Sequence, residues 1–149
     1  MRSRFVIHEH HARNLHFDLR LEMEQVLKSW AVPKGPSLDP AEKRLAVGVP
    51  DHPVTYIDYE GHISEGSYGA GDVRIWDKGY YESQTDPYRQ LMKGKLVFRF
   101  FGSKLQGEFA LVKMQNHARN WLLIKANDEY ARTDWQLETV LSFKTRLAA

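Results

Sequence analysis

The sequence predicts a mainly β protein, either a barrel or a sandwich of antiparallel strands, from two observations. Turn-forming stretches recur along the 149 residues, among them "PKGPSLDP", "VPDHP" and "EGHISEGSYGAG". Between them lie short segments rich in valine, isoleucine, tyrosine, tryptophan and phenylalanine, the residues that strands favour. Many short strands separated by frequent turn signals are typical of barrels and sandwiches.

The expected strands cover nine segments: 4–10, 15–22, 26–32, 45–49, 54–59, 72–82, 95–101, 105–114 and 120–126. Helix signals occur in two places. At 86–94, Asp86 can cap a short helix that has Pro87 in its first turn, where proline is favoured. The stretch "DWQLETVLSFKT" (134–145) predicts a C-terminal helix. No repeat or linker divides the chain, so we expect a single domain over residues 1–149.

The composition excludes several classes of protein. The net charge is only +2, so any contact with nucleic acid must come from a local patch. There are no cysteines, which removes disulfides, thiolate metal sites and cysteine nucleophiles. No apolar run approaches the ~20 residues that span a bilayer, and "MRSRFVIHEHHAR" lacks the apolar core of a secretory signal. We therefore expect a cytoplasmic protein with no membrane partner.

The most informative stretch is "HEHHARNLHFDLRLE" (8–22), which holds four of the seven histidines. In its second half, apolar and polar residues alternate strictly. Every second residue of a strand faces the same side. His16, Asp18, Arg20 and Glu22 therefore share one face, while the apolar residues between them face a core.

A hairpin between this strand and the preceding one predicts a metal site. A loop at 11–15 keeps both apolar sets in the core and sets His10 opposite His16 and His8 opposite Asp18. Opposed Cβ atoms lie roughly 4.5–5.5 Å apart, close enough to share one ion. Two imidazoles and one carboxylate suit Mn, Fe, Zn or a similar divalent ion and leave coordination positions open. The alternative is a polar, solvent-facing strand whose histidines bind nothing.

A second group of polar residues lies downstream in "DHPVTY". If this segment is extended, His52, Val54 and Tyr56 share a face, and Arg44 and Lys34 lie on nearby turns. Arginine offers a planar fork to phosphate oxygens and lysine a mobile point charge. A structural role is the alternative, and the group gains a functional meaning only if it converges on the first cluster.

Other conspicuous features are interpreted structurally. The glycine-rich stretch 60–71 lacks the ending of a phosphate-binding loop, so we expect its glycines at tight turns between strands. His11, His62 and His117 are expected to be ordinary surface histidines.

The chain resembles the 3′-phosphoesterase domain of bacterial and archaeal DNA ligase D in its free-standing form. The resemblance covers about residues 4–131, which leaves 132–149 as a C-terminal tail. It is carried by "HHARNLHFDLRLE", "LKSWAVPKGPSLDPAEKRLAV", "DHPVTYIDYEG", "EGSYGAGDVRIWDKG", "GEFALVK" and "NWLLIKANDEYA". It implies a compact antiparallel β-barrel, with the short helices at its periphery.

The resemblance also implies roles for individual residues. The metal ligands would be His10, His16 and Asp18, with manganese as the usual ion. The phosphate-binding and catalytic positions fall on four residues and a lysine in the "PKGP" turn: Arg20, Arg44, His52, Tyr56 and Lys34. His8 and Glu9 stand where the family usually has Gln-Lys, so His8 could contact the phosphate in place of the glutamine, serve as an extra ligand, or mark a loss. Glu22 could orient Arg20 or a metal-bound histidine from behind.

The activity implied is metal-dependent processing of DNA 3′ ends. Such a phosphoesterase removes a 3′-terminal ribonucleoside to leave a 3′-phosphate, then removes the phosphate to leave a 3′-hydroxyl that an end-joining ligase can seal. The partners would be DNA 3′ ends and a DNA ligase or polymerase acting in trans.

Two other functions fit some of the same residues. A His-x-Asp pair with a distant histidine could form the facial triad of a non-haem iron oxygenase. A barrel that only binds DNA ends and recruits a ligase would show binding that is indifferent to manganese, and no product. Release of phosphate from a 3′-phosphorylated oligonucleotide, without need for oxygen or an oxoacid, separates the phosphoesterase from both.

Overall fold

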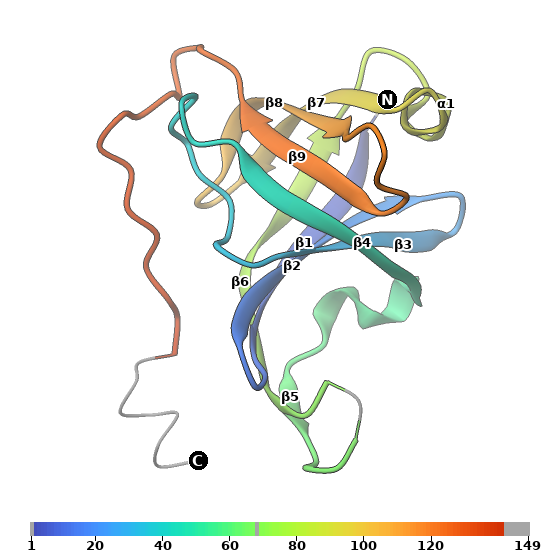
Figure 1. Ribbon diagram of the computed structural model, residues 1–149, viewed down its shortest axis with the longest axis vertical. Helices are drawn as coiled ribbons and strands as arrows, with labels where there is room; N and C mark the ends of the chain where they lie inside the picture. Colours follow the sequence, from blue (N-terminus) through green and yellow to red (C-terminus); the bar gives the residue numbers. More distant parts are fainter. Residues whose placement is uncertain (1, 68, 142–149) are drawn as a thin grey trace.

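Eight antiparallel strands close into a barrel in the computed structural model, which describes residues 2–67 and 69–141 (Figure 1). The order around the barrel is β1 (Arg2–His11), β2 (Leu15–Met23), β3 (Val26–Val32), β4 (Arg44–Pro53), β9 (Asn120–Lys125), β8 (Gln106–Lys113), β7 (Lys95–Gly102) and β6 (Gly71–Glu82). Pairing of β1 with β6 closes the barrel, and the short β5 (Gly61–Ile63) extends from β6. The predicted barrel is confirmed.

The core fills the barrel interior with alternate residues of its strands. Phe17, Leu19 and Leu21 of β2 are almost completely buried, as their alternation with polar residues predicted. Across the barrel they meet an aromatic group in which the rings of Phe98 and Phe100 lie 4.9 Å apart. Because the apolar side chains point inward, the polar residues of β1 and β2 are held on the outer face.

The short helix is confirmed as α1 (Pro87–Met92). The Asp86 carboxylate accepts a hydrogen bond from the Arg89 backbone N–H at 3.2 Å, which is the N-cap that the sequence indicated. No helix in the described part of the chain is long and apolar enough to cross a membrane.

The strand expected at 54–59 is wrong, because Val54–Asp58 forms a 3-10 helix, η1. β4 pairs with β3 as far as Pro53, and the chain then turns so that Ile57 packs against Val6 and Leu27. This small apolar cluster on the outside of the barrel outweighs the strand preference of the β-branched residues.

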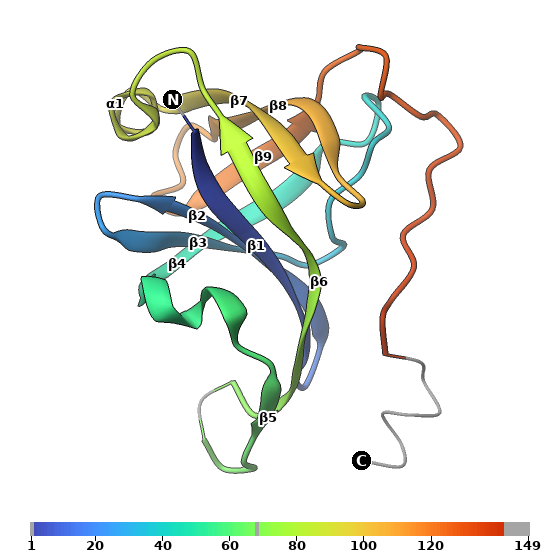
Figure 2. The same ribbon diagram turned by 180° about the vertical axis from the view of Figure 1, so that it is seen from behind.

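The C-terminal helix expected at 134–145 is also wrong for residues 134–141, and the rest of it lies outside the described residues. The segment runs along the side of the barrel (Figure 2). The indole of Trp76 donates to the Glu138 carbonyl at 2.7 Å, and the backbone N–H groups of Val140 and Leu141 donate to the buried Glu9 carboxylate. These tertiary bonds replace the intrahelical ones, so helix propensity is overridden.

A buried lysine gives a prediction about stability. The Lys125 side chain is fully buried, and its ammonium pairs with the Asp128 carboxylate and the Ala126 carbonyl. Asp128→Asn keeps an acceptor but leaves the buried ammonium without its counter-charge, so we expect the free energy of unfolding to fall by about 2–3 kcal/mol. Adding Lys125→Met should recover most of the loss in urea denaturation. Equal instability of the single and double variants would contradict this account.

Candidate metal centre and phosphate site

The β1–β2 hairpin has the register that the alternation predicted. His10 pairs with His16, and His8 pairs with Asp18. The solvent-facing alternative does not hold, because Asp18 and His8 are buried and His10 is only 8% exposed. The hairpin therefore brings the side chains of His10, His16 and Asp18 together at a partly buried site.

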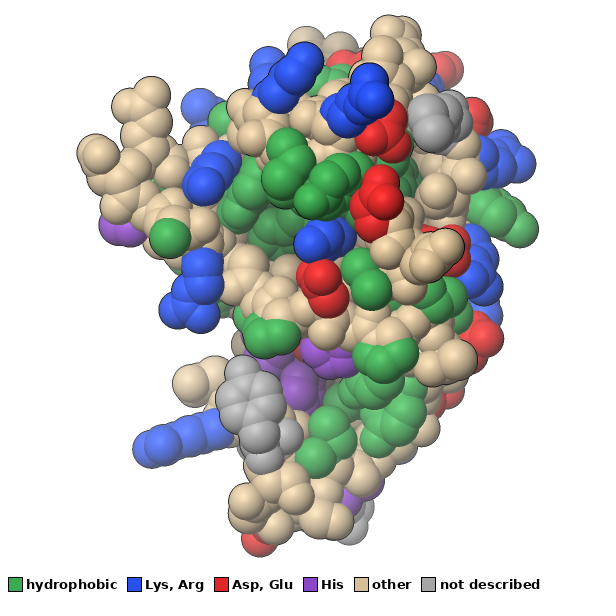
Figure 3. All heavy atoms as spheres, turned by 90° about the vertical axis from the view of Figure 1, so that its right-hand side faces the viewer, with side chains coloured by type: hydrophobic (Ala, Val, Ile, Leu, Met, Phe, Trp, Pro, Cys, Tyr) green, Lys and Arg blue, Asp and Glu red, His purple; other side chains and the backbone are tan. Residues whose placement is uncertain are grey.

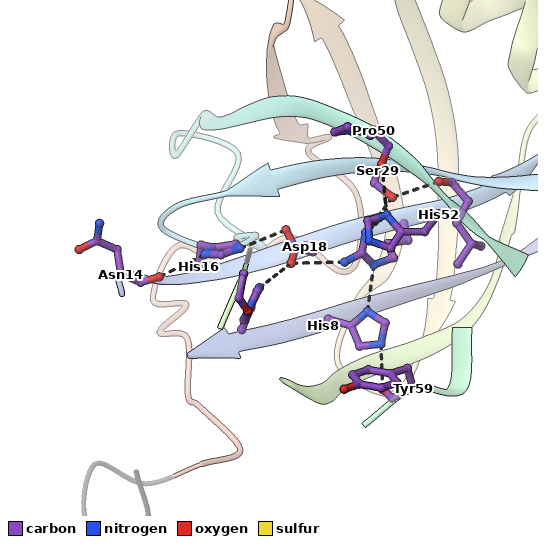
Figure 4. A network of polar contacts seen from close by, with 12 residues as sticks. His8, Asn14, His16, Asp18, Ser29, Pro50, His52 and Tyr59 are labelled. Atoms are coloured by element: carbon purple, nitrogen blue, oxygen red, sulfur yellow. Dashed lines mark hydrogen bonds and ion pairs between the residues drawn. The ribbon is translucent and has the colours of Figure 1, made fainter. Parts of the chain in front are cut away.

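His10, His16 and Asp18 form a compact set of potential metal ligands. Figure 4 shows His16 directed at the Asp18 carboxylate. Their ligand atoms all lie within 4.8 Å of one another. The Asp18 carboxylate is 3.3 Å from Nδ1 of His10 and 3.3 Å from Nε2 of His16. One divalent ion could be reached by all three side chains.

Backbone carbonyls fix how both imidazoles are presented. Nε2 of His10 lies 2.6 Å from the Gly69 carbonyl, and Nδ1 of His16 lies 3.1 Å from the Asn14 carbonyl. A carbonyl can only accept, so these nitrogens carry the ring protons in the neutral tautomers. The other nitrogen of each ring faces the Asp18 carboxylate, where it donates a hydrogen bond when the ring is protonated and offers a lone pair to a cation when the ring is neutral. Two imidazole nitrogens and a carboxylate that converge on one point can all give electron pairs to a divalent cation placed there.

The electrostatics of the cluster keep Asp18 charged. Burial opposes the anion, but hydrogen bonds from His10 and His16 and the charge of Arg20 outweigh it, and they hold the pKa of Asp18 well below its usual range. For His16, burial lowers the pKa and the Asp18 carboxylate more than offsets it, so the net shift is upward. The carboxylate is therefore available as a ligand at every pH near neutrality.

Arg20 links the potential metal ligands to a second group of polar side chains, which includes His52. Its guanidinium is buried, 3.4 Å from the Asp18 carboxylate. Nε donates to Nδ1 of His8 at 3.0 Å, and one terminal nitrogen donates to the Ser29 hydroxyl at 2.9 Å and lies 3.1 Å from Nδ1 of His52. These contacts hold the planar guanidinium in one orientation beside the potential metal ligands His10, His16 and Asp18. Burial lowers the pKa of Arg20, but arginine remains charged.

A bulge in β4 aims His52 into the site. Leu27 pairs with His52 while Ser29 pairs with Val49, so β4 has one residue more than β3 over this interval. An extra residue shifts the following side chains to the other face, a common device beside active sites. His52 thereby joins the face that carries Arg20.

The 3-10 helix then brings Tyr56 beside His52, with ring centroids 4.8 Å apart. The Tyr56 ring also stacks on Tyr59 at 4.6 Å and lies 5.1 Å from the Arg20 guanidinium. Burial, and then the Arg20 charge, lowers the pKa of His52, while burial raises the pKa of Tyr56. At neutral pH the imidazole is therefore neutral and the phenol keeps its proton. The expected convergence occurs, although the segment is not a strand.

Three other predicted site residues lie elsewhere. The Glu22 carboxylate binds Arg4, with contacts of 2.7 and 2.9 Å, and its expected contact with Arg20 is not formed. Arg44 lies on the other side of the bulge, 3.3 Å from Glu42, and is eight positions before His52 on the strand, roughly 26 Å along it. Lys34 is exposed in the turn after β3. The phosphate-binding roles of Arg44 and Lys34 stay predictions.

The structure places His8 behind Arg20. The ring is fully buried, Nδ1 accepts from Arg20, and Nε2 donates to the Tyr59 carbonyl at 3.0 Å. Both ring nitrogens of His8 thus have hydrogen-bond partners in the protein, and neither is directed at the three potential metal ligands. Ser29 was missed by sequence reasoning, although its place opposite Arg20 in a β2–β3 hairpin was a usable signal.

The remaining histidines differ from one another. His11 is not a surface residue, because it is buried with Nε2 at 2.5 Å from the Glu9 carboxylate. His62 is exposed and pairs with Asp72 at 2.9 Å. His117 is exposed, as expected.

The buried His8 predicts acid sensitivity of the metal-free protein. Burial, reinforced by the Arg20 charge, lowers the pKa of His8 from 6.5 to about 4. Between these values the unfolded chain takes up the proton first, so this contribution to stability falls as the pH falls. With chelator present, His8→Gln should lose about 2–3 kcal/mol less than the unaltered protein between pH 7 and pH 4.5 in urea denaturation. Identical losses would contradict this assignment.

The two clusters share one pocket of about 530 Å³. His10, His16 and Asp18 line it together with Arg20, His52 and Tyr56. Histidine side chains are visible in a hollow of the surface with hydrophobic side chains beside them (Figure 3). A potential cation site and a fixed guanidinium in one pocket are the elements needed to hold a phosphate ester.

Comparison with known proteins identifies the family to which the chain belongs. The family model of the DNA Ligase D 3′-phosphoesterase domain matches residues 8–113. The chain is 50% identical over 132 residues to the multifunctional non-homologous end joining protein LigD of Pseudomonas aeruginosa, which is 87% of this chain and 16% of that protein. It is 43% identical over 133 residues to the protein of the same name from Mycolicibacterium smegmatis, covering 85% and 17% of the two chains. The chain thus spans about one sixth of the length of these curated relatives.

Proposed function

We propose, from the premise that the chain belongs to the DNA ligase D 3′-phosphoesterase domain family, that it is a manganese-dependent hydrolase of DNA 3′ ends. It would remove a 3′-phosphate, and also a 3′-terminal ribonucleoside, to leave a 3′-hydroxyl for end joining. A ligase or polymerase acting in trans would be its partner. The observation that carries the proposal is the convergence of one ring nitrogen each from His10 and His16 on the Asp18 carboxylate, with Arg20 at 3.4 Å from the same carboxylate.

His10, His16 and Asp18 would hold the cation. Two nitrogens and one carboxylate suit manganese and several other divalent ions. The chemistry supplied there is neutralisation of a phosphoryl oxygen and activation of water. Because the three residues come from the two strands of one hairpin, the site needs no large rearrangement to form.

Arg20 would hold the phosphoryl oxygens and stabilise the negative charge that spreads over them in the transition state. Its orientation is set by His8 and Ser29, so the fork is already in place before the substrate arrives. Preorganised donors of this kind cost no reorganisation during the reaction.

His52 and Tyr56 would act on the other phosphate oxygens. The guanidinium of Arg20 can only donate, so Nδ1 of neutral His52 accepts and the ring proton lies on Nε2. In this state Nε2–H can donate a hydrogen bond to a phosphate oxygen. The protonated ring can give its Nε2 proton to the leaving O3′ as the P–O3′ bond breaks, while water forms the new P–O bond and releases a proton to solvent. The protonated Tyr56 hydroxyl offers a second donor. When the His52 ring is protonated, the Pro50 carbonyl at 3.1 Å from Nδ1 can accept instead.

The test uses two labelled primer-templates, one ending in a single ribonucleotide and one in a 3′-phosphate, incubated with manganese and resolved by electrophoresis. We expect the first to give a 3′-phosphate and then a 3′-hydroxyl, and the second to give a 3′-hydroxyl. Binding of both ends without any product, unchanged by manganese, would instead support the DNA-end-binding barrel. A requirement for oxygen and an oxoacid would support the oxygenase.

A further inference from the structure

The pocket has a polar floor and apolar walls. Asp18 and Arg20 are buried and lie in the floor, while four hydrophobic residues that are intermediate or exposed also line the pocket: Ala31, Val49, Pro50 and Ile63. None of the four belongs to the main core of the barrel. Water, phosphate and a metal ion gain nothing from such walls, so the walls have no part in the chemistry described above.

The register places one apolar wall directly beside the reacting centre. Ala31 pairs with Asp18 across β2 and β3, and Val49 pairs with Ser29, the residue that bonds Arg20. Pro50 follows Val49 at the bulge. A group attached to a phosphate held by Arg20 would therefore meet this wall within a few ångströms.

The second wall comes from the other side of the pocket. Ile63 lies on β5, which pairs with the beginning of β6, and this part of β6 in turn pairs with β1 at His10. The polar floor thus lies between two apolar walls that come from separate parts of the sheet. A flat ring or a sugar fits between such walls, since it buries apolar surface on both sides.

We propose that Ala31, Val49, Pro50 and Ile63 form a subsite for the terminal nucleoside of a nucleic-acid 3′ end, contacting its sugar and base. This inference rests on the proposed function, because it takes the phosphate on Arg20 to be that of a 3′ end. The four side chains carry no hydrogen-bonding group, and base identity is read by hydrogen bonds to base edges. The subsite therefore holds all four bases nearly equally, as suits an enzyme that trims ends of any sequence.

The test compares the unaltered protein with the double variant Val49→Ser/Ile63→Ser, in the presence of manganese. The substrates are a 3′-phosphorylated primer-template with each terminal base, glycerol 3-phosphate, and a phosphoserine peptide. The matched control is Leu45→Ser, which alters a 39% exposed residue four positions earlier on the same face of β4. Affinity for the 3′-phosphorylated end is measured separately by fluorescence anisotropy.

In the double variant we expect the ratio of kcat/KM for the oligonucleotide to that for glycerol 3-phosphate to fall about 10- to 100-fold. Leu45→Ser should leave the ratio unchanged, and the four terminal bases should agree within about threefold. An unchanged ratio in the double variant, a strong preference for one base, or equal use of the phosphoserine peptide would overturn the subsite. If no substrate is hydrolysed, the proposed function fails. The anisotropy then decides the subsite alone, since an affinity equal to that of the unaltered protein would refute it and a weaker one would support it.

Discussion

Arg20→Ala is expected to lower the rate of 3′-phosphate release by about 10³-fold while the affinity for manganese stays the same or rises slightly. The fork that neutralises the phosphoryl oxygens is lost, whereas His10, His16 and Asp18 keep their places. Removal of a positive charge 3.4 Å from the Asp18 carboxylate does not disfavour a cation there. Single-turnover assays give the rate, and isothermal titration gives the metal affinity.

The control for this variant is Arg20→Lys, which keeps the charge but cannot donate to His8, Ser29 and phosphate together. We expect it to recover only a small part of the rate. Thermal unfolding of all three proteins separates a loss of chemistry from a loss of fold. An Arg20→Ala protein that works at nearly the normal rate would remove Arg20 from the catalytic residues.

Asp18→Asn is expected to abolish both metal binding and turnover. The amide keeps the shape of the side chain but lacks the charge that holds a divalent cation between the two imidazoles. We expect manganese affinity to fall at least 100-fold. Since a ligand at 100 times its Kd stabilises a protein by about 2.7 kcal/mol, the variant should also lose the increase in Tm that manganese gives.

The matched control for Asp18→Asn is Asp51→Asn, an exposed carboxylate on β4 that pairs with Lys28. It removes the same charge from the protein and leaves the three potential metal ligands in place. Equal loss of manganese affinity in both variants would mean that overall charge, and not coordination, holds the metal.

The central hairpin could be predicted from the sequence because a single physical constraint fixes it. The strict alternation around Phe17 and Leu19 allows only one parity of pairing, and a short loop after His11 within that parity sets His10 opposite His16. No knowledge of the rest of the fold is needed for this step.

The parts that could not be predicted depend on contacts between distant segments. The bulge in β4 places the His52 side chain on the face that carries Arg20. The pattern of apolar and polar residues in β4 does not reveal this bulge. Likewise, the extended C-terminal segment depends on Glu9, more than a hundred residues away. The convergence of His52 and Tyr56 on Arg20 was expected only through the family resemblance, since spacing alone gave the wrong local structure.

The central claim is that His10, His16 and Asp18 bind one divalent cation beside Arg20. Crystals grown with manganese and measured near its absorption edge test it directly by anomalous scattering. The account predicts one strong peak within bonding distance of Nδ1 of His10, Nε2 of His16 and the Asp18 carboxylate. A well-ordered hairpin with no peak there, at a manganese concentration that supports full activity, would contradict it.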